Sequence, residues 1–526
     1  MTSKASPFDP ARRQFLGGMV AGAGLALLGS RAWASGLDSP FSLGVASGDP
    51  LPDGFVIWTR LAPVGAGGLE VPLPSAVPVR WTVASDENMR QVVKRGEVIA
   101  EPGGAHSVHV EVAGLQPGRP YWYRFEAAGE LSSVGRAHTA PSSRSLAPAR
   151  FGFVSCSHYE LGHFSAYRHL AAEQPDLVFF LGDYIYEYSL APGSAKLLRA
   201  HDLPEATDLA GYRRRYAQYK RDPDLQLLHS TAPCVVTWDD HEVQNDYANR
   251  WSQDAGVDPQ AFLRRRAAAY QAFYEHMPLR RSHAPRGPNM RLYRRLDYGR
   301  LARFHVLDGR QYRSEQPCIP ASGSHRGHVA SADCRDLQDP ARSMLGWEQE
   351  AWVHQGLAQS TALWNVFAQD LLVSPLLQRD PASGGLGHWT DGWDGYAATR
   401  QRLLAAIEHT RARNPVFWGG DIHSFWATDL YLGDKVGDGK VVATEFVTSS
   451  VTSDGPPFEA FNALLPLNPQ VKFFDSRPRG YVSVTLDDQV MDVRFQAISE
   501  RRDPAATLAT LKRFQVEAGR PGVRVL

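Results

Sequence analysis

The segment Asp176–Tyr186 has the sequence DLVFFLGDYIY, and the fold prediction starts from it. Its apolar run is too short for a helix, ends at a glycine and is followed by an acid, which predicts a buried parallel strand that opens into a loop. Ligands of open α/β sheets bind outside the carboxyl ends of the strands, where Asp183 is expected. If the loop curls as a first helical turn, the carboxylate of Asp183 and the phenol of Tyr186 meet at one metal ion. Phenolate oxygen suits ferric iron.

The length and the charge of the chain set broad limits. With 526 residues the chain is much longer than one typical core, so we expect two domains or one large domain with an appendage. Lysine plus arginine and aspartate plus glutamate both number 56. Because there is no basic surplus, we expect no nucleic-acid-specific binding and no anionic membrane as a partner.

The first 34 residues have the features of an export signal. Arg12 and Arg13 precede an apolar, Gly/Ala-rich stretch that ends at Leu28, and the segment Ala32–Ala34 has an Ala-Xaa-Ala pattern. This order predicts a twin-arginine signal peptide over residues 1–34, which the twin-arginine export machinery would recognise. The alternative is a membrane anchor, but the apolar stretch is shorter than the roughly 20 residues that span a bilayer. We therefore expect no permanent membrane span and a periplasmic or secreted protein.

Residues 40–141 contain short runs in which apolar and polar residues alternate, interrupted by Gly and Pro. Examples are Val79–Val83, His106–Val112 and Tyr121–Phe125. Period-two patterning broken by such turns is typical of an antiparallel sandwich, and we predict a small all-β domain similar to fibronectin type III. This stretch has no cluster of ligand-type side chains, so we expect a structural or orienting role. Residues 144–148 form the expected linker.

Beyond residue 148, apolar runs alternate with stretches of helical period. We expect helices over residues 164–173, 260–276, 346–359 and 396–410. Strands that alternate with helices predict βαβ units and a largely parallel sheet. We therefore assign residues 149–500 to a catalytic domain of the α/β (α+β-type) class, with central β-sheets flanked by helices. The tail, residues 501–526, is expected to carry one amphipathic helix that is either a lid or a surface appendage.

Five predicted strands of this domain end in side chains that ligate metals or transfer protons. The residues that follow them are Cys156, Asp183 with Tyr186, the run Asp239–Glu242, Asp308, and Asp421 with His423. Parallel strands place their carboxyl ends at one edge of a sheet, so these groups would converge on one crevice. A single acid at a strand end is more often a polar cap, but five such ends together favour a functional site.

Four motifs carry a resemblance to a known family. They are SCS at Ser155–Ser157, LGDYIYE at Leu181–Glu187, TWDDHEV at Thr237–Val243 and GDIHS at Gly420–Ser424. With these motifs in this order, the chain resembles the alkaline phosphatase D (PhoD-like) family, which is related to purple acid phosphatases and other calcineurin-like metallophosphoesterases. The segment GVASGDP at Gly44–Pro50 looks like the start of that family's N-terminal module.

The resemblance implies a site for two metals, ferric iron and calcium. By analogy with purple acid phosphatases, Asp183 would bridge them. The other implied iron ligands are Cys156, Tyr186 and His423, and the implied ligands of the second metal are Asp240 and Asp421. Thiolate and phenolate are strong donors for ferric iron, whereas carboxylates suit calcium. His241 would stabilise the pentacoordinate state or protonate the leaving oxygen, since the ordinary pKa of histidine lies near neutrality.

These implied roles predict an exported metal-dependent phosphoesterase, an alkaline phosphatase or phosphodiesterase. A metal-activated hydroxide at Asp183 would attack the phosphorus of small-molecule or polymeric phosphate esters in line. The alternatives are a specialised phosphodiesterase that acts on phospholipid or teichoic-type substrates, and a non-catalytic surface-binding protein. Degraded ligands would favour the binding protein, and none of the six predicted metal ligands is missing. The preferred ester stays open, because the loops that form the cleft have no simple code.

Further residues are candidates for supporting roles. Candidates for phosphate contacts are His158, His163, Asn245 and Arg310. Cys318 and Cys334 flank a loop rich in Gly, Ser and His, and an exported protein could either join them as a disulfide or leave them free. Cys234 lies inside an apolar strand and is expected to be a core residue.

Overall fold

The computed structural model describes residues 39–526 except 66–69, 320–326, 331–332, 381–383 and 434–438. The predicted signal peptide, residues 1–34, lies outside the described residues. In the part of the chain that is described, no helix combines the length and the apolar character needed to cross a bilayer.

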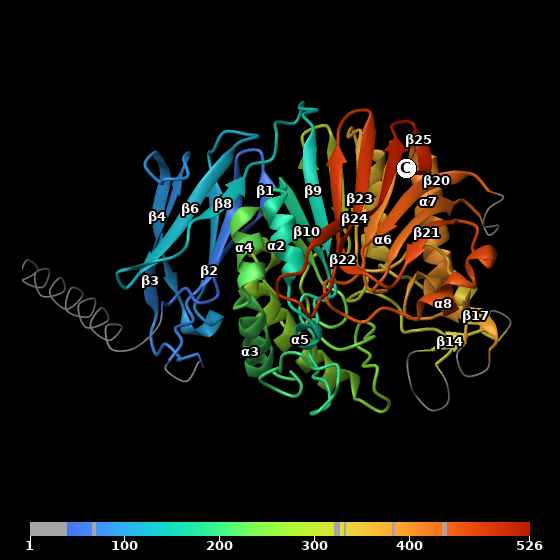
Figure 1. The fold of residues 1–526 in the computed structure, drawn as a ribbon, viewed down its shortest axis with the longest axis horizontal. Coiled ribbons are helices and arrows are strands. Elements are labelled where there is room, and N and C mark those ends of the chain that lie inside the picture. Colours follow the sequence, from blue (N-terminus) through green and yellow to red (C-terminus); the bar gives the residue numbers. More distant parts are fainter. Residues whose placement is uncertain (1–38, 66–69, 320–326, 331–332, 381–383, 434–438) are drawn as a thin grey trace, which may run out of the picture.

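Two large β-sheets packed face to face form the centre of the molecule (Figure 1). The strands of the first are β1 (Val45–Leu51), β2 (Gly54–Arg60), β5 (Ser107–Ala113), β9 (Ala149–Val154), β10 (Leu177–Leu181), β11 (Cys234–Thr237), β22 (Arg479–Leu486), β23 (Val490–Ile498), β24 (Leu508–Glu517) and β25 (Arg520–Val525). Those of the second are β12 (Arg294–Tyr298), β13 (Ala302–Val306), β15 (Trp364–Ala368), β18 (Pro415–Gly419), β19 (Phe425–Tyr431), β20 (Val441–Val447) and β21 (Val471–Asp475).

Strand order shows where each sheet is parallel. The ten-stranded sheet has the order β25-β24-β23-β22-β9-β10-β11-β1-β2-β5, and the seven-stranded sheet has the order β12-β13-β15-β18-β20-β19-β21. Pairing is parallel from β9 to β1 and from β13 to β20, and antiparallel in the flanking strands. The expected parallel arrangement is therefore restricted to the centre of each sheet, which is the part that carries the predicted ligands.

Aromatic side chains fill the space between the two sheets. The Trp418 ring on β18 stacks on Phe153 of β9 with ring centroids 5.0 Å apart, and it meets the edge of Phe179 on β10 at 5.2 Å. All three rings are fully buried, and each contributes about 2 kcal/mol by leaving water. Because this contact fixes β18 against β9 and β10, the loops that follow the three strands lie close together.

Helices cover the outer faces of both sheets. They are α2 (Ser165–Ala172), α3 (Leu209–Lys220), α4 (Pro223–Thr231) and α5 (Pro259–His276) on the ten-stranded sheet, α6 (Trp347–Ala358) and α7 (Ala397–Thr410) on the seven-stranded sheet, and the short α8 (Phe458–Asn462). The four predicted helices correspond to α2, α5, α6 and α7. The sequence prediction missed α3, α4 and α8. In α3 the buried face includes the polar side chains Arg215, Gln218 and Lys220, which weaken the apolar period.

The N-terminal all-β region is confirmed, but it shares a sheet with the rest of the molecule. Its own sheet consists of β3 (Val77–Ala84), β4 (Val92–Ala100), β6 (Pro120–Ala127), β7 (Glu130–Leu131) and β8 (Gly135–His138). This sheet packs on β1, β2 and β5, and β1 pairs with β11 in parallel through Gly48 and Cys234. A Cβ atom at Gly48 would lie 2.8 Å from the Cys234 carbonyl oxygen, so the glycine permits this junction. The predicted sandwich therefore has one sheet that continues into the catalytic region.

The predicted C-terminal helix is wrong. Residues 508–525 form the hairpin β24–β25, which extends the ten-stranded sheet beyond β23. Phe514 and Val516 are buried at a spacing of two residues, and Gly519 adopts a φ of 82° in the turn between the strands. The Phe514 ring lies 4.8 Å from Phe495 of β23. The apolar face offered by the neighbouring strand therefore decides the structure of a segment whose own pattern is ambiguous.

Candidate metal centre

The predicted ligands lie in loops at the edge where both sheets present the carboxyl ends of their parallel strands. Cys156 follows β9, Asp183 follows β10, Asp240 follows β11, and Asp421 and His423 follow β18. Among the described residues, four groups have all ligand atoms within 4.8 Å of one another: Cys156, Asp183 and His423; Asp183, Asp240 and His241; Asp239, Asp240 and Asp421; and Asp240, Asp246 and Asp391. Asp183 belongs to two of these groups and so connects them.

The backbone at four of these positions adopts an uncommon conformation. Left-handed φ values occur at Cys156 (61°), Asp183 (51°), Asp421 (64°) and His423 (54°). For residues other than glycine this conformation costs about 1 kcal/mol or more. Gly182, with a φ of 91°, precedes the first acid, and a Cβ atom there would lie 2.4 Å from Cβ of Asp239. The glycine therefore lets the loops after β10 and β11 approach each other.

Tyr186 links the ligands of the first group. Its hydroxyl donates to Oδ2 of Asp183 at 2.8 Å and lies 3.0 Å from Nε2 of His423, and the Ser453 hydroxyl donates to the phenol oxygen at 2.6 Å. The other ring nitrogen of His423, Nδ1, lies 2.7 Å from the carbonyl oxygen of Asp454 and therefore carries a proton. This bond directs the Nε2 lone pair of His423 at the cluster, which is the tautomer that a metal requires.

Burial opposes charge on the ligands of this group. It raises the pKa of Cys156 and of Tyr186 well above their ordinary values, with the Asp183 carboxylate adding to both shifts, and it lowers the pKa of His423 to about 3. Oδ1 of Asp183 is buried and has no hydrogen-bond donor among the described residues, at a cost of about 1–3 kcal/mol. A cation would satisfy this oxygen and would favour the thiolate and phenolate forms. The donor set therefore fits a metal ion.

Carboxylates build a second group beside the first. Oxygen atoms of Asp239, Asp240 and Asp421 converge there. Nε of Arg310 lies 2.5 Å from Oδ1 of Asp239 and 3.6 Å from Oδ2 of Asp370, the acid that follows β15. Both oxygens of Asp370 and Oδ2 of Asp239 are buried without a donor among the described residues. Desolvation raises the pKa of Asp370 and Asp421 well above the ordinary value and that of Asp239 to about 6. An oxygen-rich group of this kind fits a hard cation such as calcium.

The sequence pattern was not used to predict Asp370 as a site residue, although Asp370 follows a strand in the same way as the predicted ligands do. It follows the apolar run of β15, which is the same pattern that identified the other strand ends. Asp308, in contrast, was expected in the crevice and belongs to neither group. Its Oδ1 accepts from Nε1 of Trp238 at 2.9 Å and from the backbone N–H groups of Arg310 and Gln311. Asp308 therefore stabilises the loop that carries Arg310.

His241 is oriented by the buried carboxylate of Glu187. No role for this residue was predicted from the sequence. Nδ1 of His241 lies 2.6 Å from Oε2 of Glu187, whose Oε1 accepts from the backbone N–H of Asn245 at 2.8 Å. Burial lowers the pKa of His241, but the carboxylates of Glu187, Asp240 and Asp183 outweigh burial and raise it well above the ordinary value. The imidazole therefore keeps its proton and has a fixed orientation beside Asp183.

The four candidates for phosphate contacts differ in position. Arg310 is fully buried, and its Nη2 lies 3.9 Å from carboxylate oxygens of both Asp240 and Asp421. The His158 ring lies 4.4 Å from the Tyr186 ring, and its Nε2 has no hydrogen-bond partner in the described part of the chain. The Asn245 side chain donates to Gln253 at 2.9 Å, and the backbone N–H of His163 donates to the Arg501 carbonyl. Arg310 and His158 therefore adjoin the cluster.

Comparison with known proteins shows which family the chain belongs to. Residues 151–495 match the sequence model of the PhoD-like phosphatase family, and residues 29–141 match that of its N-terminal domain. The chain belongs to the PhoD-like phosphatase family. It is 43% identical over 491 residues to alkaline phosphatase D of Bacillus subtilis (strain 168), covering 92% of this chain and 82% of that protein.

Solved structures support the same relationship for this PhoD-like phosphatase. A structure of PhoD superposes with a TM-score of 0.85 at 41% identity, covering 93% of this chain and 92% of that one. A purple acid phosphatase from yellow lupin seeds, PPD1, superposes with a TM-score of 0.56 at 13% identity, covering 91% and 74% of the two chains. At that identity the second comparison shows a shared fold.

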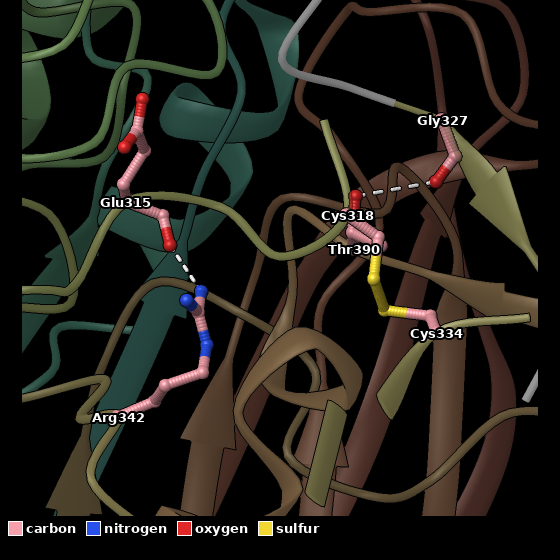
Figure 2. The surroundings of a disulfide bond; sticks show 6 residues. All are labelled: Glu315, Cys318, Gly327, Cys334, Arg342 and Thr390. Atoms are coloured by element: carbon pink, nitrogen blue, oxygen red, sulfur yellow. Dashed lines mark hydrogen bonds between the residues drawn. A yellow bond between two sulfur atoms is a disulfide. The ribbon is translucent and has the colours of Figure 1, made fainter. Parts of the chain in front are cut away.

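In this PhoD-like phosphatase, Cys318 and Cys334 form a disulfide (Figure 2). The segments around it are hydrogen-bonded to Asp391, which pairs with Arg310, and to one another. The backbone N–H of Thr390 donates to the Gly327 carbonyl at 3.3 Å, and Nε2 of Gln316 donates to Oδ1 of Asp391 at 2.6 Å. Cys234 is buried and free, as expected for a core residue.

A cavity of about 390 Å³ opens beside the cluster. Asp421 and His423 form part of its wall, and their side chains are 35% and 25% exposed, whereas Asp183 is 2% exposed. A substrate of this PhoD-like phosphatase would therefore approach the ligand groups from the cavity side.

Proposed function

We propose that this PhoD-like phosphatase is an exported, metal-dependent phosphoesterase that hydrolyses small-molecule or polymeric phosphate esters. The observation that carries the proposal is the position of Asp183 between two donor groups of different chemistry. One group has thiol, phenol and imidazole donors, and the other has carboxylates. Such a pair of adjacent sites is suited to clamping the attacking and leaving oxygens of an in-line displacement at phosphorus.

Ferric iron and calcium are the proposed cofactors. Cys156, Tyr186 and His423 would hold iron together with Asp183, because thiolate and phenolate favour a ferric ion. Asp240 and Asp421 would hold calcium, which prefers six to eight oxygen ligands. When bound, the metal ions supply Lewis acidity and a water of lowered pKa. Asp370 is a further oxygen donor beside the calcium ligands, with both oxygens lacking donors among the described residues.

The protein side chains would then position the ester and supply a proton. Nδ1 of His241 donates to Glu187, and the surrounding carboxylates raise the pKa of the imidazole. In the charged ring the second proton is at Nε2, and His241 would donate that proton to the leaving oxygen. Glu187 would keep the imidazole charged and correctly turned. The Nη2 group of Arg310, which has no hydrogen-bond partner among the described residues, would bind a phosphate oxygen.

Export is supported by two independent features. The N-terminal segment has the arginine pair, apolar stretch and Ala-Xaa-Ala pattern of a twin-arginine signal. The disulfide between Cys318 and Cys334 is of a kind that persists in oxidising compartments. We therefore assign the mature protein to the periplasm or the exterior, with the twin-arginine machinery as a transient partner.

Hydrolysis of bis-p-nitrophenyl phosphate and p-nitrophenyl phosphate tests the proposal. The purified protein should release p-nitrophenol from at least one of them and stop when a chelator is added. We expect His241→Gln to lower kcat by about 100-fold or more, which is the usual contribution of a general acid. His409→Gln, an exposed change on α7, should leave kcat unchanged. No turnover of either ester with iron and calcium supplied would refute the proposal.

A further inference from the structure

The cavity beside the cluster has an apolar wall that the hydrolysis itself does not use. Side chains of Leu372, Leu376, Ile422, Trp389 and Phe461 line it. The Trp389 side chain is 39% exposed, while Leu372, Ile422 and Phe461 are half-buried. Partly exposed apolar side chains that line a cavity next to a reactive centre are typical of a site for an apolar ligand group.

Apart from Trp389, the wall rests on a packed aromatic cluster. Leu372, Ile422 and Phe461 pack against a buried core that contains Trp426 and Phe474, whose ring centroids lie 4.3 Å apart. Such a surface keeps its shape without a ligand, so little conformational entropy is lost when an apolar group covers it.

Charge around the cavity excludes anionic groups. The carboxylates of Asp394, Asp421 and Asp454 contribute to the lining, whereas no lysine or arginine does so among the residues that the structure describes. Asp394 pairs with Arg400, and Asp454 pairs with Arg501 and Lys196; none of these three cations lines the cavity. On the apolar wall an anionic group would therefore be desolvated without a lysine or arginine to pair with it.

We propose that this cavity is a subsite for an uncharged alkyl ester group of a phosphodiester, and that Trp389 and Phe461 set the preference for that group. The inference rests on the proposed phosphoesterase activity and adds a substrate class to it. The phosphoryl group would lie at the ligand cluster, and one ester arm would extend past Asp421 and His423 onto the apolar wall. Covering this wall stabilises ground state and transition state alike, so the preference would appear in KM and in kcat/KM.

A series of alkyl p-nitrophenyl phosphates tests the proposal, because the chromogenic leaving group stays constant while the other arm varies. From methyl to hexyl, kcat/KM should rise by up to about fourfold for each buried methylene, and by more than about tenfold in total. A 5-carboxypentyl arm of the same length should return kcat/KM to the methyl value or below. A flat series, or an equal gain with the carboxylate arm, would overturn the proposal.

Two variants locate the effect. Trp389→Ala and Phe461→Ala should each lower the hexyl-to-methyl ratio of kcat/KM by about tenfold. Trp347→Ala is the matched control, since Trp347 is 55% exposed and lies on α6 outside the cavity lining. Unfolding midpoints check that the variants fold. If methyl p-nitrophenyl phosphate is hydrolysed but both variants keep the wild-type hexyl-to-methyl ratio of kcat/KM, the proposed subsite is refuted. The proposed phosphoesterase activity is then still supported. If the methyl ester is not hydrolysed at all, the proposed function itself fails.

Discussion

Replacing Asp391 by asparagine should destabilise the protein strongly. The Asp391 carboxylate is 3% exposed and accepts two bonds from Nη1 of Arg310 at 3.0 and 2.8 Å, one from Nη2 of Arg313 at 2.6 Å and one from Nε2 of Gln316 at 2.6 Å. The guanidinium groups of Arg310 and Arg313 are both fully buried. Asp391→Asn keeps the volume but removes the one carboxylate that pairs with Arg313 among the described residues, whereas Arg310 keeps its pair with Asp239. It also turns an amide N–H₂ group toward hydrogen-bond donors.

The expected loss in the free energy of unfolding is about 3–5 kcal/mol, because breaking one side of a buried ion pair leaves an uncompensated charge. Equilibrium unfolding in guanidinium chloride measures it from the shift in midpoint. Asp492→Asn is the matched control. That aspartate pairs with Arg513 at 3.0 Å on the surface, where the arginine side chain is 54% exposed, so the loss should stay below about 1 kcal/mol. Equal losses in the two variants would refute the reasoning about burial.

Three further outcomes are expected. Glu187→Gln should lower kcat by about 10- to 100-fold, because the amide holds the His241 ring less firmly and removes a carboxylate that keeps it charged; steady-state kinetics check this, and unchanged kcat would contradict it. Burial lowers the pKa of Lys220 from 10.5 to about 7. Between pH 7 and pH 10.5 the unfolded chain therefore holds one proton more than the folded protein, so the free energy of unfolding should increase as the pH is raised through this range. Lys220→Met should remove several kcal/mol of that rise in denaturant titrations, and an identical pH dependence would oppose the assignment. Deleting the hairpin β24–β25 removes Phe514 from its contact with Phe495; soluble yield should fall sharply, whereas unchanged yield and thermal stability would indicate a surface appendage.

The strand ends could be predicted from sequence because their pattern is local. A short apolar run followed by a polar residue, as at Asp183 and Asp421, needs no knowledge of distant segments. The two sheets bring these ends together through a core that is itself visible as apolar runs, such as the one that contains Trp418. Asp370 had the same signal, and its role escaped only because no motif drew attention to it.

Other features depend on distant contacts and left no local signal. The hairpin at the C-terminus follows from pairing with β23, and the continuity of the N-terminal sandwich with the central sheet follows from one close approach at Gly48. The partner of His241 is Glu187, which lies 54 positions earlier in the chain. Such pairs are set by the fold and cannot be inferred from spacing.

Metal analysis of the folded protein and its cysteine variants tests the central claim most directly. Elemental analysis of the wild type should find about one iron per chain together with calcium, and Cys156→Ala should lose the iron. Cys234→Ala is the matched control, because Cys234 is the other buried free cysteine and lies outside the ligand groups; this variant should keep its iron. Iron retained in Cys156→Ala, or zinc in place of iron in the wild type, would contradict the proposed metal centre.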